Sequence, residues 1–347
     1  MQQVSRAVRR AEGVRVLEVR ELTDGAAWDA LVAAHPYAHP LQCWGWGEVK
    51  RAAGWRAHRV AIFDGPALRS AAQVLTRSLP GVPLAMTYAP RGPVATPDDA
   101  EALQALAQAL RRYGREQRGI FCKVDPAWPA GASHALEKSG FRPSQESIQV
   151  SGTFTIDLRQ PEETILAGMR SKTRQYVRKA EREETDIVRD TTGELLGACY
   201  AIYEETAKRA RFGLHERAYY DNLFHLYPPE RQYLYVALRQ GVSLSFLWIV
   251  CAGRHAVEFY GGVSEAGQEW KSNYLLKWHA IREMKAAGYE IYDLNGRLNE
   301  GIAQFKQGFG PVETSWIGPF DAIYRPLLYA AWARGLPFAR RLLRRAG

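Results

Sequence analysis

The same order of predicted strands and helices occurs twice along the chain, and this repetition constrains the fold more than any other feature. The first copy has strands at 57–63, 70–76 and 84–88, a helix at 100–118 and a strand at 119–125. The second has strands at 233–238, 244–250 and 256–260, a helix at 273–287 and a strand at 288–293. Asp125 follows Gly92 by 33 positions, and Asp293 follows Gly262 by 31. We infer a duplicated unit in which an antiparallel hairpin precedes a β-loop-helix-β crossover, which predicts α/β domains with mixed sheets.

Length and composition agree with two globular domains. The chain has 347 residues, of which 46% are hydrophobic and 24% charged, and this excludes a disordered chain and a small disulfide-bonded scaffold. No apolar run approaches the ~18 residues of a membrane-spanning helix. No apolar segment follows Arg6, Arg9 and Arg10 as it would in a secretory signal. We therefore expect a soluble, cytoplasmic protein.

Several common catalytic and binding motifs are missing. The four cysteines, at positions 43, 122, 199 and 251, never form a C-x-x-C pair, so we expect no metal site, redox dithiol or disulfide framework. The chain also lacks a G-x-G-x-x-G fingerprint, a P-loop and an evident Ser-His-Asp arrangement. If the protein is an enzyme, it works by positioning and electrostatics rather than through a covalent nucleophile.

Positive charge is concentrated on one predicted helix. The formal net charge is +9, and the clearest helical pattern, from Pro161 to Glu184, has an apolar stripe with basic residues around it. Those basic residues are Arg170, Lys172, Arg174, Arg178, Lys179 and Arg182. Two interpretations stay open: a solvated helix face, or a surface that binds a phosphate chain or an RNA backbone.

Two further segments combine cations with aromatic or helical positions. Trp46 and Lys50 are four residues apart, so a helix places them on one face, where the lysine could receive a phosphate oxygen. The alternative is that the tryptophans pack in the core and Lys50 reaches solvent. Lys208, Arg209 and Arg211 lie at the end of a helix that begins near Leu196, where they either complement the helix dipole or bind a phosphate or carboxylate.

Loops that follow strands supply the remaining candidates. In Gln304–Gly310, Lys306 lies between Phe305 and Phe309, where it could neutralise an oxyanion, or the segment could be a surface turn. Tyr88 and Tyr260 each begin a loop between a strand and a helix, the usual ligand position in open α/β sheets.

Eight short motifs occur in a characteristic order. They are Gln42-x-Trp44-x-Trp46-x-x-x-Lys50, Tyr88-x-Pro90-x-Gly92-Pro93, Met169-x-x-Lys172-x-Arg174-x-x-x-x-x-Ala180, Thr206-x-x-Arg209-x-x-Phe212, Tyr260-Gly261-Gly262-x-Ser264, Asn273-x-Leu275-Leu276-x-Trp278-x-Ala280-Ile281, Tyr292-Asp293-x-x-Gly296 and Phe305-Lys306-x-Gly308-Phe309-Gly310. In this order, from about Gln42 to Tyr324, the chain resembles the Fem (FemABX) family of peptidoglycan-bridge aminoacyltransferases.

The resemblance implies a fold and a reaction. It implies two tandem acetyltransferase-like (GNAT) domains. It also implies transfer of an amino acid (glycine, alanine or serine) from aminoacyl-tRNA to the side-chain amine of a stem peptide. The acceptor is lipid II or the soluble UDP-N-acetylmuramyl pentapeptide, and no cofactor is needed besides aminoacyl-tRNA as co-substrate. Which amino acid and which acceptor are used stays open.

The resemblance also implies roles for individual residues. Lys50 and Arg209 would hold the acceptor's diphosphate, with Arg211 as a substitute for Arg209. Trp46, Tyr88 and Tyr260 are further candidates for substrate binding. Lys306, with Phe305, would lie near the reacting centre and stabilise the tetrahedral oxyanion or the tRNA terminus. Lys172, Arg174 and Arg178 would bind tRNA, and no metal is implied.

The chain differs from related proteins in two respects, and the resemblance also predicts its domain boundaries. No room exists between Tyr203 and Gln232 for the helical arm of longer family members, so the chain resembles the compact type. The coenzyme A phosphate loop of acetyltransferases is absent, which argues against acyl-CoA as donor. We expect a first domain of residues 1–155 with a C-terminal return segment, 316–347, and a second domain of residues 156–315.

The C-terminal tail and the function each retain alternatives. Residues 326–347 interleave leucines and aromatics with arginines, which predicts either peripheral contact with the inner membrane leaflet or packing on the first domain. The alternatives to the transferase are a GNAT-like acyltransferase or peptide ligase acting on another amine, and a non-catalytic, basic RNA-binding protein.

Overall fold

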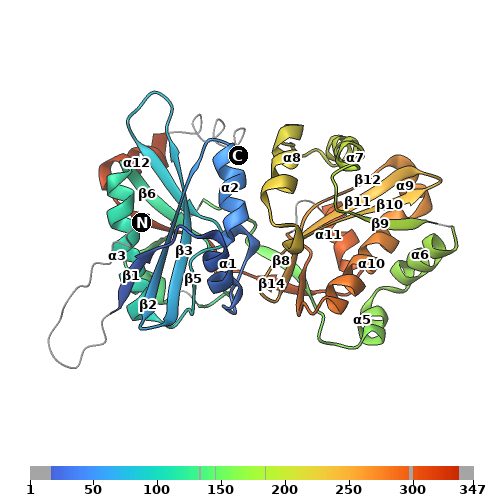
Figure 1. Ribbon diagram of the computed structural model, residues 1–347, viewed down its shortest axis with the longest axis horizontal. Coiled ribbons are helices and arrows are strands. Elements are labelled where there is room, and N and C mark those ends of the chain that lie inside the picture. Colours follow the sequence, from blue (N-terminus) through green and yellow to red (C-terminus); the bar gives the residue numbers. More distant parts are fainter. Residues whose placement is uncertain (1–16, 133, 145, 184, 297–299, 336–347) are drawn as a thin grey trace. The chain divides into compact units, whose positions relative to one another are not determined.

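The computed structural model describes residues 17–132, 134–144, 146–183, 185–296 and 300–335. These residues divide into two compact units (Figure 1). Unit 1 comprises the residues up to Gln149 and those from Trp316 onward, and unit 2 comprises Val150–Ser315.

Unit 1 is built on one mixed sheet with the strand order β1-β2-β3-β4-β6-β15-β7, and β5 pairs with β3. Its elements are β1 (Glu18–Glu21), α1 (Gly25–Ala33), η1 (Pro40–Gln42), α2 (Trp44–Ala52), β2 (Arg56–Asp64), β3 (Ala67–Ser78), β4 (Ala85–Ala89), β5 (Val94–Ala95), α3 (Ala100–Glu116), β6 (Gly119–Val124), α4 (His134–Lys138), β7 (Arg142–Pro143), β15 (Phe320–Ile323) and α12 (Pro326–Gly335). β2, β3 and β4 are antiparallel neighbours, and α3 connects β4 to the parallel strand β6. β15 adds to β6 in antiparallel register.

The alternation of side chains along β2 and β3 determines which helix packs on each face of the unit 1 sheet. Val60 and Val74 belong to the core cluster that includes Leu106 of α3. Their neighbours in sequence, Arg59 and Gln73, contact each other under α2. Since successive side chains of a strand point to opposite faces, α3 and α2 cover different faces of this sheet.

Unit 2 repeats the topology, with the strand order β14-β8-β13-β12-β11-β10-β9. Its elements are β8 (Gly152–Asp157), α5 (Glu162–Gly168), α6 (Ser171–Arg182), β9 (Asp186–Asp190), α7 (Leu196–Ala210), α8 (Arg217–Leu226), η2 (Pro229–Arg231), β10 (Gln232–Arg239), β11 (Val242–Ala252), β12 (His255–Val263), α9 (Glu265–Trp270), α10 (Ser272–Ala286), β13 (Ile291–Asp293), α11 (Glu300–Gln307) and β14 (Val312–Ser315). β10, β11 and β12 are antiparallel, and α10 leads to the parallel strand β13. The predicted duplication of strand and helix order is therefore confirmed. β8, which the predicted boundary after residue 155 divides, lies wholly in unit 2.

In unit 2 the parallel strands β12 and β13 stop pairing well before β12 ends, whereas β4 and β6 of unit 1 pair up to the ends of both strands. β4 pairs with β6 along its length, to Ala89 and Val124. β12 pairs with β13 only from His255 to Val257 and then continues to Val263 without this neighbour. The irregular register between β11 and β12 occurs just beyond that point. Residues of β12 after Val257 are thus released from the β13 ladder.

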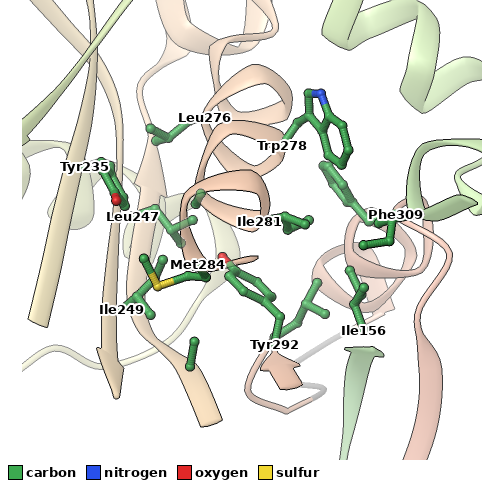
Figure 2. Packing of buried hydrophobic residues seen from close by; sticks show 14 of the residues in the cluster. Ile156, Tyr235, Leu247, Ile249, Leu276, Trp278, Ile281, Met284, Tyr292 and Phe309 are labelled. Carbon is green, nitrogen blue, oxygen red and sulfur yellow. The ribbon is translucent and has the colours of Figure 1, made fainter. Parts of the chain in front are cut away.

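The core of unit 2 lies between the sheet and α10. Leu247, Ile249 and Cys251 alternate along β11 and belong to the same buried cluster as residues of α10. Figure 2 shows Trp278, Ile281 and Met284 of this helix with Tyr292 and Phe309 around them. Phe246 and Trp248, on the opposite face of β11, instead contact aromatic rings of α7 and α8.

The predicted single helix from Pro161 to Glu184 is wrong, because the structure has two helices, α5 and α6, separated at Met169 and Arg170. Both residues have extended backbone, with ψ values of 150° and 144°. The amide of Arg170 donates to Gly308 O at 2.9 Å, so a distant segment of chain competes with the helix for this backbone group. Helix propensity within residues 161–184 could not reveal that partner.

Candidate functional site

Helix α2 of unit 1 presents Lys50 beside Trp46. The helix predicted there is present, and the Lys50 Nζ atom lies 4.8 Å from the centre of the Trp46 ring. Lys50 is only 8% exposed, so the alternative in which it extends into solvent does not hold. Burial lowers the pKa of Lys50 to about 8, and the positive charge of Arg77 acts in the same direction.

Arg77, which was not among the predicted site residues, is the second cation of this region. It lies near the end of β3, with its guanidinium carbon 5.3 Å from the centre of the Trp55 ring. No motif distinguishes it in the sequence, since cations near strand ends are common. Two like charges held close together beside aromatic surface are a typical arrangement for binding an anion.

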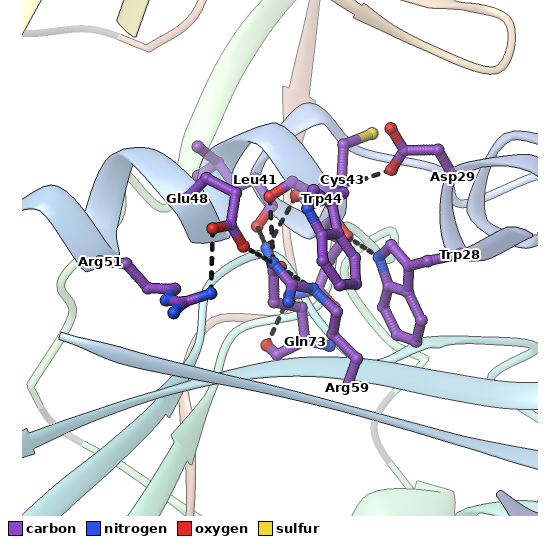
Figure 3. A network of polar contacts seen from close by, with 10 residues as sticks. Trp28, Asp29, Leu41, Cys43, Trp44, Glu48, Arg51, Arg59 and Gln73 are labelled. Carbon is purple, nitrogen blue, oxygen red and sulfur yellow. Dashed lines mark hydrogen bonds and ion pairs between the residues drawn. The ribbon is translucent and has the colours of Figure 1, made fainter. Parts of the chain in front are cut away.

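A polar network anchors the helix that carries Lys50 (Figure 3). Arg59 donates from Nε to Gln73 Oε1 at 2.8 Å and from Nη2 to Glu48 Oε1 at 2.9 Å and Trp44 O at 3.1 Å. A Cβ on Gly47 would lie 2.3 Å from atoms of both Arg59 and Gln73. A side chain at position 47 would therefore displace the network of Arg59 and Gln73, which lies between α2 and the sheet.

The loop after Tyr88 is held by two buried side chains. Asp125 accepts the Tyr88 hydroxyl at 2.8 Å and the Arg91 backbone amide at 2.7 Å. Gln42 Nε2 donates to Pro90 O at 2.7 Å. Burial raises the pKa of Asp125 to about 6, and the charge of Arg91 opposes this shift. Tyr88, predicted to bind substrate, thus has its hydroxyl engaged in shaping the loop.

In unit 2, the Thr206-x-x-Arg209 motif holds the end of β12. Thr206 Oγ1 accepts the Val263 amide at 3.0 Å, and Arg209 Nη2 donates to Val263 O at 2.7 Å. The Arg209 side chain is 38% exposed. Arg211 follows α7 in the left-handed conformation with φ 58° and is exposed. The cations predicted to bind phosphate therefore lie on the surface at the C-terminus of α7.

Tyr260 belongs to a cluster of tyrosines from α7, α8 and β12. Its ring centre lies 5.8 Å from Tyr203 and 5.1 Å from Tyr220, and it shares a hydrogen bond with Tyr219. Burial raises the pKa of Tyr220 to about 12 and that of Tyr260 further, so these hydroxyls are protonated at neutral pH. Tyr219 and Tyr220 were not among the predicted site residues, although two consecutive tyrosines on a short helix are a recognisable signal.

Lys306 lies near the end of α11 and is 7% exposed, so the predicted alternative of a surface turn does not hold. Its Nζ atom donates to Asn295 O at 2.8 Å and Gly296 O at 2.9 Å. Burial lowers the pKa of Lys306 to about 8, and Glu258 opposes this shift. The ring centre of Phe305 lies 5.4 Å from that of Phe309, so the two aromatic residues of this motif contact each other.

A row of aromatic rings connects the basic helix α6 with this lysine motif. The Lys172 Nζ atom lies 5.6 Å from the ring centre of Tyr176. The Tyr176 ring lies 4.8 Å from Tyr274, and Tyr274 lies 5.0 Å from Phe305. We call Tyr176, Tyr274 and Phe305 the aromatic row. Tyr176 and Tyr274 were not among the predicted site residues.

The predicted tRNA-binding residues of α6 differ in their surroundings. Lys172 and Arg178 are exposed. Arg174 donates to Ala167 O at 3.1 Å and also to Met169 O. These are carbonyls at the C-terminal end of α5, where a cation is favourable. Arg174 therefore stabilises the break between α5 and α6.

His35 and His39 have H-x-x-x-H spacing, but their Nδ1 atoms accept the amides of Tyr37 and Leu41. Within the described ranges no group of three metal-ligating side chains is found, and no helix there is long and apolar enough to cross a membrane.

Tyr329 and Trp332 of α12 pack against Phe121. The rest of the predicted amphipathic tail, residues 336–347, lies outside the described residues.

Comparison with known proteins agrees with this arrangement. The FemAB family model matches residues 24–139, 130–240 and 237–334. The lipid II:glycine glycyltransferase of Staphylococcus saprophyticus is 22% identical, over 90% of this chain and 94% of its own length. The crystal structure of FemX has a TM-score of 0.83 at 20% identity and covers 90% of this chain and 99% of its own. A tandem GNAT protein from the clavulanic acid biosynthesis pathway has a TM-score of 0.52 at 15% identity, over 89% and 98% of the two chains.

These structural likenesses confirm two tandem GNAT-like domains, and the family model confirms the resemblance carried by the eight motifs. Because the model matches most of the chain, the protein belongs to the FemAB family and is an aminoacyltransferase.

Proposed function

We propose that the protein transfers an amino acid from aminoacyl-tRNA to the side-chain amine of the stem peptide of lipid II, at the cytoplasmic face of the membrane. The observation that carries the proposal is Lys306, a buried lysine that follows Phe305, the last residue of the aromatic row, in the chain. The staphylococcal relative is a lipid II:glycine glycyltransferase, and this supports lipid II as acceptor. Glycine, alanine and serine are the donor amino acids that fit the proposal.

The transfer reaction forms a tetrahedral intermediate, and the negative charge on its oxygen must be stabilised. The acceptor amine attacks the ester carbonyl of aminoacyl-tRNA, so that a C–N bond forms and the ester C–O bond breaks. The ribose hydroxyl of the tRNA leaves with the proton that the amine releases. Lys306 would stabilise the negative charge on the carbonyl oxygen of the tetrahedral intermediate, and it can do so only as an ammonium. Its hydrogen bonds to Asn295 O and Gly296 O hold that ammonium in place.

Unit 1 offers cations for the acceptor's diphosphate. Lys50 is held by a helix that the Arg59 network anchors, and Arg77 adds a second positive charge nearby. A bound phosphate would favour the ammonium form of Lys50, because an opposite charge offsets the cost of burial. Arg209 and Arg211 stay predicted phosphate ligands, and Arg209 already donates to the backbone of Val263.

Unit 2 offers a surface for the tRNA end. Lys172 and Arg178 are exposed cations on α6, and exposed cations of this kind bind a nucleic acid backbone without reading its sequence. The aromatic row begins next to Lys172 and ends at Phe305, the residue before Lys306. Aromatic rings stack on unpaired bases, so the 3′ end of a tRNA could follow this row to the lysine.

The experiment is transfer of radiolabelled amino acids from a mixed aminoacyl-tRNA pool to lipid II and, separately, to UDP-N-acetylmuramyl pentapeptide. We expect label on lipid II and loss of transfer in Lys306→Met. Lys285→Met is the matched control, because Lys285 also donates to two backbone carbonyls of unit 2, Leu158 O at 2.7 Å and Gln160 O at 2.8 Å. Label only on the soluble precursor would replace the acceptor. Label on neither would overturn the proposal.

A further inference from the structure

Three side chains from three elements of unit 2 meet next to Lys306. Lys277 of α10 donates from Nζ to both carboxylate oxygens of Glu258 on β12, at 2.6 Å to Oε2. Tyr292 of β13 donates its hydroxyl to Glu258 Oε1 at 2.8 Å. Glu258 is 6% exposed and Lys277 is 4% exposed. A buried ion pair of this kind costs desolvation and is poor evidence of added stability, so its presence calls for another explanation.

The position of Glu258 follows from the sheet. It is the first residue of β12 beyond the last pair with β13, Val257 and Asp293. The register between β11 and β12 becomes irregular at this point. The Tyr292 hydroxyl bridges from β13 to Glu258 there. The carboxylate therefore lies where the two parallel strands cease to pair, which is also where the chain turns toward Lys306.

The ion pair contacts the motif that carries Lys306. The Lys277 Nζ atom lies 5.4 Å from the ring centre of Phe305 and 5.8 Å from that of Phe309. Asp293, next to Tyr292, accepts the Asn295 amide at 2.7 Å and so shapes the turn whose carbonyls receive Lys306. The triad thus contacts both aromatic residues of the motif that carries Lys306, and Lys306 itself binds the turn that follows β13.

The described charged groups that act on Lys306 come from three packed elements: Glu258 from β12, Lys277 from α10 and Asp293 from β13. On α11 itself, Glu300 is exposed. Two cations and two carboxylates in one buried region balance each other. Removing a single charge leaves an excess that neighbouring water cannot screen.

We propose that Glu258, Lys277 and Tyr292 form a positioning triad that determines the charge state of Lys306 for the transfer reaction; this rests on the proposed function. Glu258 favours the ammonium form of Lys306, and Lys277 limits that effect by pairing with Glu258 and repelling Lys306. The triad does not touch the reacting atoms. It acts through the lysine.

The two charged members have opposite effects, and this makes the proposal testable. The rate constant kcat/KM falls at high pH as Lys306 loses its proton, and we call this fall the high-pH limb of the pH profile. In Glu258→Gln, Lys277 and Lys306 repel each other with one carboxylate fewer nearby, so the high-pH limb moves to lower pH by about one unit. In Lys277→Met, a repelling cation is lost, so the same limb moves to higher pH. A side chain with a purely structural role would lower activity at every pH without moving the limb.

Two further variants show whether a moved limb reflects the charges or a loss of folding. Glu258→Gln/Lys277→Met removes both charges together, and we expect its limb to lie close to that of the unchanged protein. Tyr292→Phe keeps all charges and removes the hydroxyl that offsets the charge of Glu258, so its limb is expected to lie between those of the unchanged protein and Lys277→Met. Limbs that coincide in all four variants would overturn the triad while leaving the transferase intact.

A readout without turnover separates the triad from the proposed function. The titration of Lys306 is followed by NMR in protein labelled with ¹³C at lysine Cε, with the resonance assigned from Lys306→Arg. We expect its midpoint to fall in Glu258→Gln and rise in Lys277→Met, even if no donor or acceptor supports transfer. An unchanged midpoint in both variants would overturn the triad.

Discussion

The Tyr88 hydroxyl donates to Asp125 Oδ2 at 2.8 Å, which connects the end of strand β4 to the residue after its parallel neighbour β6. The same carboxylate holds the Arg91 amide. One buried acid therefore determines the course of the loop between β4 and α3, the position where open α/β sheets bind ligands.

Tyr88→Phe should lower both stability and acceptor affinity. The substitution leaves the Asp125 carboxylate without its phenolic donor, and we expect a loss of about 1–3 kcal/mol in the free energy of unfolding, measured by urea titration. Tyr324→Phe is the matched control, since the Tyr324 hydroxyl donates to Leu110 O at 3.0 Å elsewhere in unit 1. Only Tyr88→Phe should raise the KM for acceptor. An equal KM in both variants would show that the loop does not contact the acceptor.

Lys50→Met should raise the KM for acceptor by about 10- to 100-fold. This change corresponds to the loss of one charge-assisted hydrogen bond, which contributes about 1.5–3 kcal/mol to binding. Arg51→Met is the control, because Arg51 is an exposed neighbour that pairs with Glu48 at 3.1 Å. The measurement is acceptor-dependent initial rate. If both variants bind acceptor equally well, Lys50 is not a phosphate ligand.

Acceptor affinity should also depend on pH through Lys50. Its lowered pKa of about 8 means that the ammonium is present below this pH and is lost as pH rises through it. In the unchanged protein, affinity for acceptor should therefore fall above pH 8. Lys50→Arg should keep its charge and extend binding to higher pH. An identical profile for the two proteins would contradict this assignment.

Gly310→Ala should destabilise unit 2 and reduce kcat. A Cβ there would lie 2.2 Å from Gly168 O, and the residue has φ 70°. Gly288→Ala is the control, because Gly288 has φ 86° and nothing within 4 Å of the added Cβ. We expect a loss of about 1–2 kcal/mol for the control, from backbone strain alone, and a larger loss with lower kcat for Gly310→Ala. Thermal unfolding and transfer rates measure the two effects. Equal losses would mean that the chain relaxes around the clash.

The basic residues of α6 should separate into two kinds. Lys172→Ala and Arg178→Ala should weaken tRNA binding and reduce its dependence on salt, with stability unchanged, because both side chains are exposed. Arg174→Ala should instead cost about 1 kcal/mol of stability, since it releases the carbonyls of Ala167 and Met169. Filter binding at two salt concentrations and urea titration distinguish them. Unchanged tRNA affinity in the first two variants would refute their role.

Local pattern was enough for much of the fold. The alternation in strands β2, β3, β10 and β11 and the helical periods of α3 and α10 are properties of short segments. Their repeated order predicted the two crossovers, which the sheets confirm. The placement of Trp46 and Lys50 on one helix face follows from their spacing alone.

The sequence by itself thus determined the order of elements, the repeated topology and the motifs that indicated the family. Only the tertiary structure decided where the helix at 161–184 breaks, because Gly308 O reaches Arg170 from a distant part of the chain. It also decided that Lys50 and Lys306 are buried and that Glu258 pairs with Lys277. Desolvation and charge pairing depend on segments that pack from far along the chain, so neither can be derived from the residues adjacent in sequence.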